Sequence, residues 1–328
     1  MEYDLVFSLG DCSNLKYYIP LVYYAKKRDL KVSFDIHFGW NKWCSVSVKS
    51  NHEWTLNLMH ENKIPVFHRS TDFAKVRICN EGRWNPKERE AKTLIYSLTT
   101  LTDYSYTYFK YIDDVDFCVF PSKYFINFIK EENKIILGTG GQHTKKIVAK
   151  TVNAIAENSG KNLFLGSPKY DLVKNFCKKE ILKKYELHDG KKYALFIYPR
   201  VGDLRHTDYK VKLKELKNLG YTIITKTRIK DPFQNYEKDI IDHYFYDKGF
   251  WPSTMLELIY VSDVVVNTDS CTVKEAVMLD KKVVNVKSKS YNVLEDLYVE
   301  NAKDIFLWNY NSSEKILDHI DLQINKDH

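Results

Sequence analysis

A short polar turn, N-T-D-S-C-T at 267–272, carries side chains suited to binding an anion. It follows an apolar run, Val264 to Val266, whose β-branched residues favour a buried strand, and it precedes a segment with helical spacing, Val273 to Leu279. A helix that starts in such a turn presents unpaired backbone N–H groups and the positive end of its dipole, which suit a diphosphate. The turn therefore predicts an anion site at Ser270 and Thr272, and Asp269 and Cys271 in the same turn are further candidate donor-binding residues.

Glu275 lies about one turn into the predicted helix, where its carboxylate can accept hydrogen bonds from a ribose diol. The alternative is ordinary helix capping. Ser, Thr and Asp are common N-cap residues, and Thr272 with Glu275 has the spacing of a capping box. The two interpretations predict the same helix start and differ in whether a ligand binds there.

Strands and helices alternate over most of the chain, which predicts an α/β protein with parallel sheets. In the first half we expect strands at 3–9, 31–38, 65–68, 117–120, 134–137 and 162–165, with helices at 14–28, 51–62 and 122–131. The aromatic and basic segment 74–111 is less regular and is interpreted as loops. The second half repeats the alternation, with strands at 193–198, 221–225, 243–246, 264–266, 283–286 and 304–307, and helices at 172–185, 208–219, 253–261, 273–279 and 312–324.

Two successive stretches of this alternation predict two Rossmann-like, doubly wound domains facing a central cleft. We expect an N-terminal acceptor domain at 1–166, a connecting helix and hinge region at 167–192, and a C-terminal nucleotide-donor domain at 193–328. For the final helix, 312–324, packing back on the N-terminal domain is the alternative to a place in the second domain. Ligands of such folds bind at the carboxyl ends of the strands, so the turns there are the places to look for chemistry.

Composition excludes several classes of protein. The 328 residues contain no apolar stretch of about 18, so no membrane span is expected, although peripheral contact with a membrane stays open. The N-terminus begins at once with a strand pattern instead of a secretory signal, and the six cysteines form no C-x-x-C pair, so we expect a cytoplasmic protein with free thiols and no structural zinc. The net charge of +7 is modest for this length, and the lysine pairs are interpreted as solvated helix faces instead of a nucleic-acid site.

Four segments together resemble the GT-B superfamily, in the branch that contains CDP-glycerol glycerophosphotransferases and UDP-N-acetylglucosamine 2-epimerases. They are G-T-G-G-Q-H-T-K-K at 138–146, L-G-S-P-K-Y-D at 165–171, Y-A-L-F-I-Y-P-R at 193–200 and S-D-V-V-V-N-T-D-S-C-T-V-K-E-A at 262–276. The last is the strongest match, and the N-terminal hundred residues match in pattern only.

The resemblance implies a glycosyltransferase that moves a sugar from a nucleotide-diphosphate sugar to the hydroxyl of a glycan or other acceptor, without a metal or other cofactor. Ser270, Thr272 and the backbone of Cys271 would hold the diphosphate, and Glu275 the ribose. Arg200 and Lys226, at the ends of adjacent predicted strands, would neutralise the phosphates of the leaving nucleotide. Ordinary surface charge is the alternative for these two cations.

Two residues are candidates for the base that deprotonates the acceptor hydroxyl. His143 aligns, with an offset of a residue or two, with the catalytic His of the family, and an imidazole titrates in the range that this proton transfer requires. Asp11, in the turn after the first strand, is the competing base. Helix capping is the alternative role for each, with packing a further one for His143.

Three departures from the family bear on substrate and mechanism. Lys226 and Arg228 stand where the glycerophosphate and sialyl members carry a His-Pro, which weakens CDP-linked donors and leaves UDP-, GDP- or dTDP-sugars open. The Gly-Asp-Thr segment of the epimerases is missing, which lowers that activity in the ranking. Asp114-Val115-Asp116 resembles a metal-binding D-x-D but precedes a strand, so we interpret it as a solvated loop. A polyol-phosphate transferase, a non-catalytic nucleotide-sugar-binding module and a 2-epimerase remain the alternatives, in that order.

Overall fold

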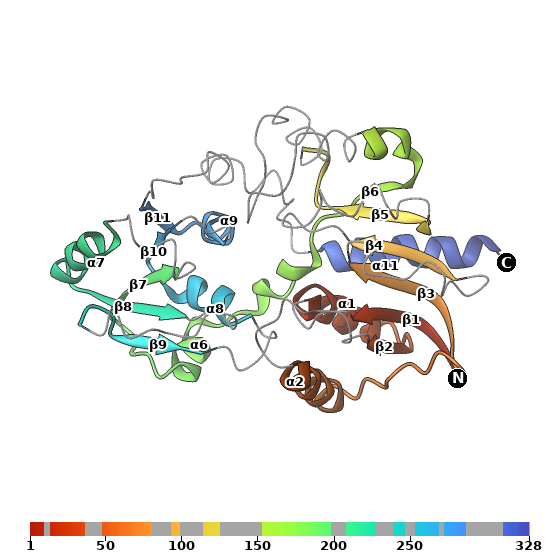
Figure 1. Cartoon of the computed structure of the whole chain (residues 1–328), viewed down its shortest axis with the longest axis horizontal. Helices are drawn as coiled ribbons and strands as arrows, with labels where there is room; N and C mark the ends of the chain where they lie inside the picture. Colours follow the sequence, from red (N-terminus) through yellow and green to blue (C-terminus); the bar gives the residue numbers. More distant parts are fainter. Residues whose placement is uncertain are drawn as a thin grey trace. The chain divides into compact units, whose positions relative to one another are not determined.

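The chain forms two compact units, seen here in a computed structural model. The structure describes residues 1–9, 14–36, 48–80, 93–98, 114–124, 153–197, 208–226, 239–246, 253–268, 272–286 and 311–327. Unit 1 comprises Met1–Lys174 and Asp304–His328, and unit 2 comprises Asn175–Lys303 (Figure 1). The first change of unit thus falls inside the segment 167–192 that the sequence predicts as a connection. The final helix belongs to unit 1.

Unit 1 contains a six-stranded parallel sheet in the order β2-β1-β3-β4-β5-β6. Its strands are β1 (Glu2–Leu9), β2 (Val32–Ile36), β3 (Phe73–Asn80), β4 (Leu94–Leu98), β5 (Phe117–Phe120) and β6 (Asn162–Phe164). Its α-helices are α1 (Leu15–Lys27), α2 (Val48–Glu61) and α11 (Ser312–Ile324). Parallel strands need long crossover connections. Helix α1 lies in the connection from β1 to β2, and α2 lies in that from β2 to β3, as the alternating pattern of the sequence predicts.

Side chains of β1 alternate between two packed layers. Phe7 contacts Tyr18 of α1, with ring centroids 5.2 Å apart, and Tyr18 also packs near Phe34 of β2. Val6, the preceding residue, belongs to a separate buried cluster with Phe67. Apolar burial on both faces is the expected source of stability for a parallel sheet.

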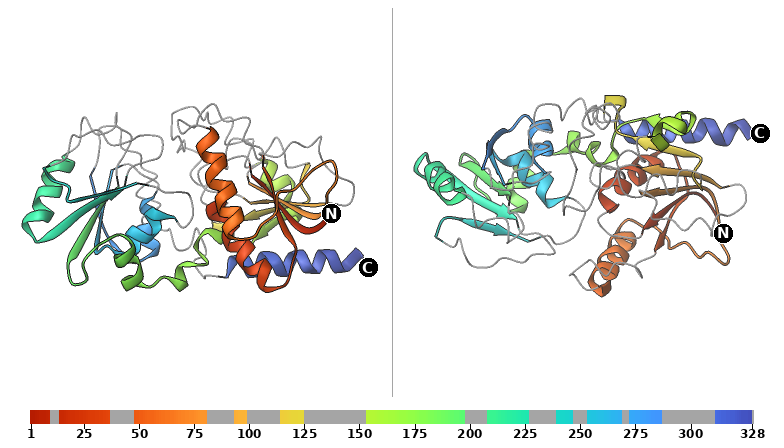
Figure 2. Two further views of the ribbon diagram at one scale, coloured as in Figure 1. Left: turned by 90° about the horizontal axis from the view of Figure 1, so that it is seen from below. Right: turned by 45° about the horizontal axis from the view of Figure 1, so that its top comes forward.

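Helix α11 packs against the earlier elements of unit 1 through polar and aromatic contacts, although it comes last in the sequence (Figures 1 and 2). Arg28, just after α1, forms ion pairs with Asp318 at 2.7 Å and Asp321 at 2.8 Å. His319 packs edge-on against Tyr96 and Phe117, and its Nδ1 lies 2.8 Å from the Tyr96 hydroxyl. None of the described helices is long and apolar enough to cross a membrane.

Unit 2 contains a five-stranded parallel sheet in the order β11-β10-β7-β8-β9. Its strands are β7 (Lys192–Ile197), β8 (Tyr221–Lys226), β9 (His243–Phe245), β10 (Val264–Asn267) and β11 (Lys282–Asn285). Its helices are α6 (Lys178–Lys184), α7 (Tyr209–Asn218), α8 (Thr254–Val261) and α9 (Val273–Met278).

Different helices pack on the two faces of the unit 2 sheet (Figure 2). Leu195 and Ile197 of β7 pack in one cluster with residues of α6, α8 and α9, whereas Phe196 packs in the other with Tyr209 of α7. The rings of Phe196 and Tyr209 stack, with their centroids 5.3 Å apart. The continuous apolar run of β7 is therefore the consequence of a strand covered on both sides.

The prediction of loops throughout 74–111 was wrong, because this segment includes most of β3 and all of β4. Lys75 and Arg77 interrupt the apolar pattern of F-A-K-V-R-I-C-N, so β3 was not recognised as a buried strand. Arg77 nevertheless points into the structure, where it meets Asp35, and Lys75 forms an ion pair with Asp4 at 2.7 Å. A charged residue in a buried strand breaks the apolar pattern, and a partner that lies far away in the sequence gives no local signal that the charge is buried.

Two further elements differ from the prediction. The strand expected at 65–68 is reduced to a single bridge between Phe34 and Val66. The helix expected at 172–185 is divided into a 3₁₀ turn, Val173–Asn175, and α6. The elements expected at 134–137 and 304–307, and most of the helix expected at 122–131, lie outside the described residues.

Candidate functional site

In unit 2, the carboxyl ends of β7, β8 and β10 meet at one edge of the sheet. The chain runs from β7 to β8 on one side, whereas β10 pairs with the other side of β7, so the strand order reverses between β7 and β10. At this point the buried Thr268 hydroxyl donates to the carbonyl of Ile197 at 3.1 Å. Open α/β sheets bind ligands outside the carboxyl ends of the strands at such a reversal. The edge is therefore the first candidate site.

Lys226 is the last residue of β8 and pairs in register with Ile197. Only 9% of the residue is exposed. An ammonium group at this depth is costly unless anionic or polar groups surround it. The structure thus places one predicted donor residue, with its charge, at the edge where a diphosphate is expected.

Thr272 and Glu275 follow β10 at the same edge. The Glu275 N–H donates to the Thr272 carbonyl at 3.0 Å, but the Thr272 side chain makes no capping hydrogen bond to α9. The threonine half of the predicted capping box is therefore not formed. Glu275 is 4% exposed, and a carboxylate so deeply buried needs hydrogen-bond donors to remain ionised.

The other predicted site residues lie outside the described part of the chain. They are Asp11, His143, Arg200, Asp269, Ser270 and Cys271. Their roles as base and donor-binding residues remain predictions.

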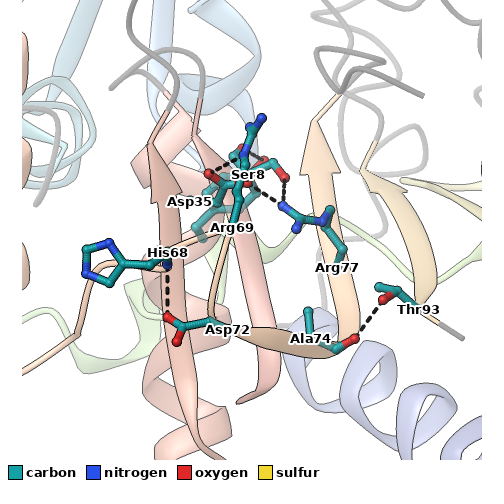
Figure 3. A network of polar contacts seen from close by, with 9 residues as sticks. Ser8, Asp35, His68, Arg69, Asp72, Ala74, Arg77 and Thr93 are labelled. Carbon is teal, nitrogen blue, oxygen red and sulfur yellow. Dashed lines mark hydrogen bonds and ion pairs between the residues drawn. The ribbon is translucent and has the colours of Figure 1, made fainter. Parts of the chain in front are cut away.

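A second candidate site lies in unit 1, where the strand order reverses between β1 and β3. Asp35 of β2 lies between two arginines near the end of the sheet (Figure 3). Arg77 Nη1 is 2.5 Å from Asp35 Oδ2 and 3.2 Å from the Ser8 hydroxyl, and Arg69 Nε is 3.1 Å from both carboxylate oxygens. Asp35 and Arg77 are each 3% exposed. These contacts link β1, β2 and β3 through their side chains.

The sequence alone did not predict this network. Its only signal was an aspartate in V-S-F-D-I and an arginine in the segment interpreted as loops. Opposite charges in two strands on either side of β1 become a pair only when the strand order β2-β1-β3 is known. A buried ion pair is then expected, because an isolated buried charge would be very costly.

Two asparagines complete the polar groups at this reversal. Asn14 precedes α1, and Asn80 is the last residue of β3. The Asn80 amide Nδ2 donates to Asn14 Oδ1 at 2.8 Å, and each residue is 5% exposed. The pair thus joins the helix that follows β1 to the end of β3.

The segment G-S-P-K-Y-D at 166–171 serves a structural purpose in unit 1. The carboxylate of Asp171 accepts hydrogen bonds from the backbone N–H groups of Ser312 and Ser313, the first residues of α11. Burial raises the pKa of Asp171, although these hydrogen bonds act in the opposite direction. Asp171 therefore caps a helix that lies far from it in sequence.

Asp114 and Asp116 precede β5, as the sequence predicts. The Asp116 carboxylate accepts a hydrogen bond from the Ile95 N–H at 2.9 Å, and the Asp116 N–H donates to the Ile95 carbonyl at 3.1 Å. Asp116 is therefore engaged in holding β4 against β5, which is more than the solvated loop we expected.

No family model matches the sequence, and no curated protein matches it. Solved structures match over the whole chain. The wall teichoic acid polymerase TagF aligns with a TM-score of 0.60 at 12% identity, covering 99% of this chain and 89% of TagF. The UDP-GlcNAc 2-epimerase from Neisseria meningitidis, bound to UDP-GlcNAc, aligns with a TM-score of 0.53 at 12% identity, covering 98% and 99%.

The chain has a GT-B-like fold. The MnaA protein of S. aureus, solved with UDP, is a further match, with a TM-score of 0.50, 12% identity and coverage of 98% and 97%. The resemblance that the four sequence segments suggested is confirmed at the level of the fold. Unit 2, Asn175–Lys303, overlaps the segment 193–328, whose role as a nucleotide-donor domain stays a prediction.

Proposed function

We propose that the protein is a glycosyltransferase that moves a sugar from a nucleotide-diphosphate sugar to a hydroxyl group. One observation carries the proposal. Lys226 and Glu275, a buried cation and a buried carboxylate, both belong to the edge of unit 2 where a doubly wound sheet binds its ligand. Their types match two groups of such a donor, since an ammonium group can pair with a diphosphate and a carboxylate can accept hydrogen bonds from a ribose diol.

The reaction requires one displacement and one proton transfer. The acceptor oxygen forms a bond to the anomeric carbon, and the bond from that carbon to the diphosphate oxygen breaks. The acceptor proton passes to the base, Asp11 or His143. Lys226, with Arg200 and the 270–272 turn, stabilises the negative charge on the leaving nucleoside diphosphate, and Glu275 orients the ribose.

The test is a titration of the full chain with UDP-, GDP-, CDP- and dTDP-sugars, followed by thermal stabilisation and by nucleotide release. We expect one class to raise the melting temperature, because a ligand that binds only the folded state stabilises it. Glu275→Ala should weaken that binding about 10- to 100-fold, since a hydrogen bond to a charged group is lost. Glu215→Ala removes a surface carboxylate of α7 in the same unit and serves as the matched control.

The proposal is wrong if the wild-type chain binds none of these donors, or if Glu275→Ala binds as tightly as the control. Binding without turnover in the presence of hydroxyl acceptors would instead indicate a nucleotide-sugar-binding module.

A polyol-phosphate transferase is the second candidate. It is favoured by the match to TagF, whose TM-score of 0.60 exceeds the 0.53 of the epimerase. In that case the acceptor oxygen attacks the phosphorus of the transferred group and a nucleoside monophosphate leaves. Incubation with CDP-glycerol distinguishes the two candidates, because release of CMP supports phosphate transfer and release of a nucleoside diphosphate from a sugar donor supports glycosyl transfer.

A further inference from the structure

The asparagine pair of unit 1 leaves two polar groups without a partner. Among the described residues, neither Asn14 Nδ2 nor Asn80 Oδ1 forms a hydrogen bond, although both atoms are buried. Buried polar groups in proteins are nearly always paired, and those that are not call for an explanation such as a ligand or a water. The pair therefore marks a place where a binding partner is expected.

The position of Asn14 strengthens this expectation. An asparagine at a helix N-cap normally accepts a hydrogen bond from the first turn of its helix. The Asn14 side chain makes no such bond to α1 and is directed to Asn80 instead. The register of β1 with β3, in which Phe7 lies opposite Ile78, brings Leu9 and Asn80 to the same level at the carboxyl edge. The unpartnered groups thus lie at the reversal of strand order, where doubly wound sheets bind ligands.

The two unpartnered groups of the asparagine pair indicate which kind of ligand fits them. One NH2 group and one carbonyl oxygen remain unpartnered, and exchanging oxygen and nitrogen in both side chains leaves the same two groups. An alcohol hydroxyl satisfies both, because it accepts from the NH2 and donates to the carbonyl. A phosphate would be repelled by the carbonyl oxygen, and an ammonium by the NH2 group.

Side-chain contacts hold together the strands that lead to the pair. Arg77 of β3 donates from Nη1 to the Ser8 hydroxyl of β1 and to the Asp35 carboxylate of β2. Asp11, a candidate base, precedes Asn14 in the chain by three residues. A binding group held on strand and helix ends is placed more accurately than one held on a loop alone.

We propose that Asn14 and Asn80 form a subsite that binds an alcohol hydroxyl of the acceptor through one donated and one accepted hydrogen bond. The inference deepens the proposed function, on which it rests, because it assigns the acceptor a neutral hydroxyl and names the residues that hold it. It concerns unit 1 alone and does not depend on which nucleotide unit 2 binds.

The first experiment follows the side-chain amide signals of Asn14 and Asn80 by NMR in the full wild-type chain, assigned through correlations to their own Hβ atoms. Glycerol and N-acetylglucosamine are the hydroxyl probes, and inorganic phosphate is the anion probe. We expect at least one hydroxyl probe to shift both amide signals in a saturable manner, whereas phosphate does not. Signals that respond to neither hydroxyl probe, or only to phosphate, overturn the assignment.

The second experiment separates this subsite from the donor site. With the donor that binds the wild type, Asn80→Leu should raise the KM for the responding hydroxyl probe about tenfold and leave the donor Kd unchanged. Asn62→Leu, at an exposed position after α2, is the matched control. A chain that binds no donor contradicts the proposed function, while the NMR titration still decides the subsite. An unchanged KM in Asn80→Leu, or a weaker donor Kd, overturns the subsite.

Discussion

The two reversals of strand order use one topology in different ways. In unit 1 the polar side chains Asp35 and Arg77 lie within the strands, where they bind each other. In unit 2 the strands β7 and β10 stay apolar almost to their ends, and the candidate residues Lys226 and Glu275 come at or after the ends. Removing one partner of a charged pair inside a sheet leaves the other charge buried, whereas polar groups at the carboxyl ends of the strands lie where doubly wound sheets bind ligands. We therefore expect substitutions in unit 1 to act on stability and those in unit 2 to act on binding.

The largest effect should come from Arg77→Met. The change removes a buried arginine from the carboxylate of Asp35 and leaves Arg69, whose side chain is 34% exposed, beside it. We expect a loss of about 3–5 kcal/mol in the free energy of unfolding, the usual effect of breaking a buried pair. Urea unfolding measures this loss of stability, and hydrogen exchange of the backbone amides in β1, β2 and β3 shows whether it arises in these strands.

Arg69→Ala is the matched control, because it removes the more exposed partner of the same carboxylate. It should cost about 1 kcal/mol or less. If the two variants lose the same stability, the network is not organised around the pair of Asp35 and Arg77, and the contrast with unit 2 weakens.

Lys226→Met tests the opposite side of the comparison. Lys226 is the last residue of its strand, whereas Arg77 pairs with a buried carboxylate inside the sheet, so we expect a smaller loss of stability than in Arg77→Met. Donor affinity should fall about 10- to 100-fold, since the charged contact to the diphosphate is lost. Calorimetric titration measures the affinity, and Lys212→Met on α7 is the control.

If Lys226→Met is strongly destabilised, as expected for Arg77→Met, and keeps its donor affinity, then the charge of Lys226 stabilises the fold and does not bind the donor. Unit 2 would then resemble unit 1, and the proposed donor site would lose one of its three described residues, Lys226, Thr272 and Glu275.

A smaller effect is expected from Asp171→Ala. The variant leaves the N–H groups of Ser312 and Ser313 without their acceptor, so α11 should dock less firmly, by about 1–2 kcal/mol. Hydrogen exchange in α11 measures this. Asp318→Ala, with a side chain 64% exposed, removes a surface ion pair of the same helix and should change exchange much less. Equal effects of the two variants would contradict the capping role.

The smallest effect concerns pH. Burial, with a lesser contribution from Lys326, lowers the pKa of His319 below its usual value of 6.5. Between these two values the unfolded chain binds more protons than the folded one, so stability falls as the pH drops below about 6.5. We expect the exchange of α11 to rise over this range. His319→Gln should abolish the dependence, and a variant with an unchanged pH profile would exclude His319 as its source.

The parts of the candidate sites that are formed by consecutive residues could be predicted from the sequence. The segment 262–276 contains a strand, a turn and a helix start in consecutive residues, so β10, Thr272 and Glu275 were identified and placed together. Asp35, Arg77, Asn14 and Asn80 were missed, because each is an ordinary residue until the strand order brings them together.

The sequence by itself determined the alternation of strands and helices, the two-unit α/β class and the resemblance to GT-B enzymes, because apolar periodicity and short motifs are properties of neighbouring residues. Only the tertiary structure decided that 73–80 is a strand, that Asp171 caps α11, and that two asparagines share a buried hydrogen bond at the reversal of unit 1. The physical reason is the same in each case. A buried polar or charged side chain is tolerated only when its partner is present, and that partner lies tens to hundreds of residues away in the chain.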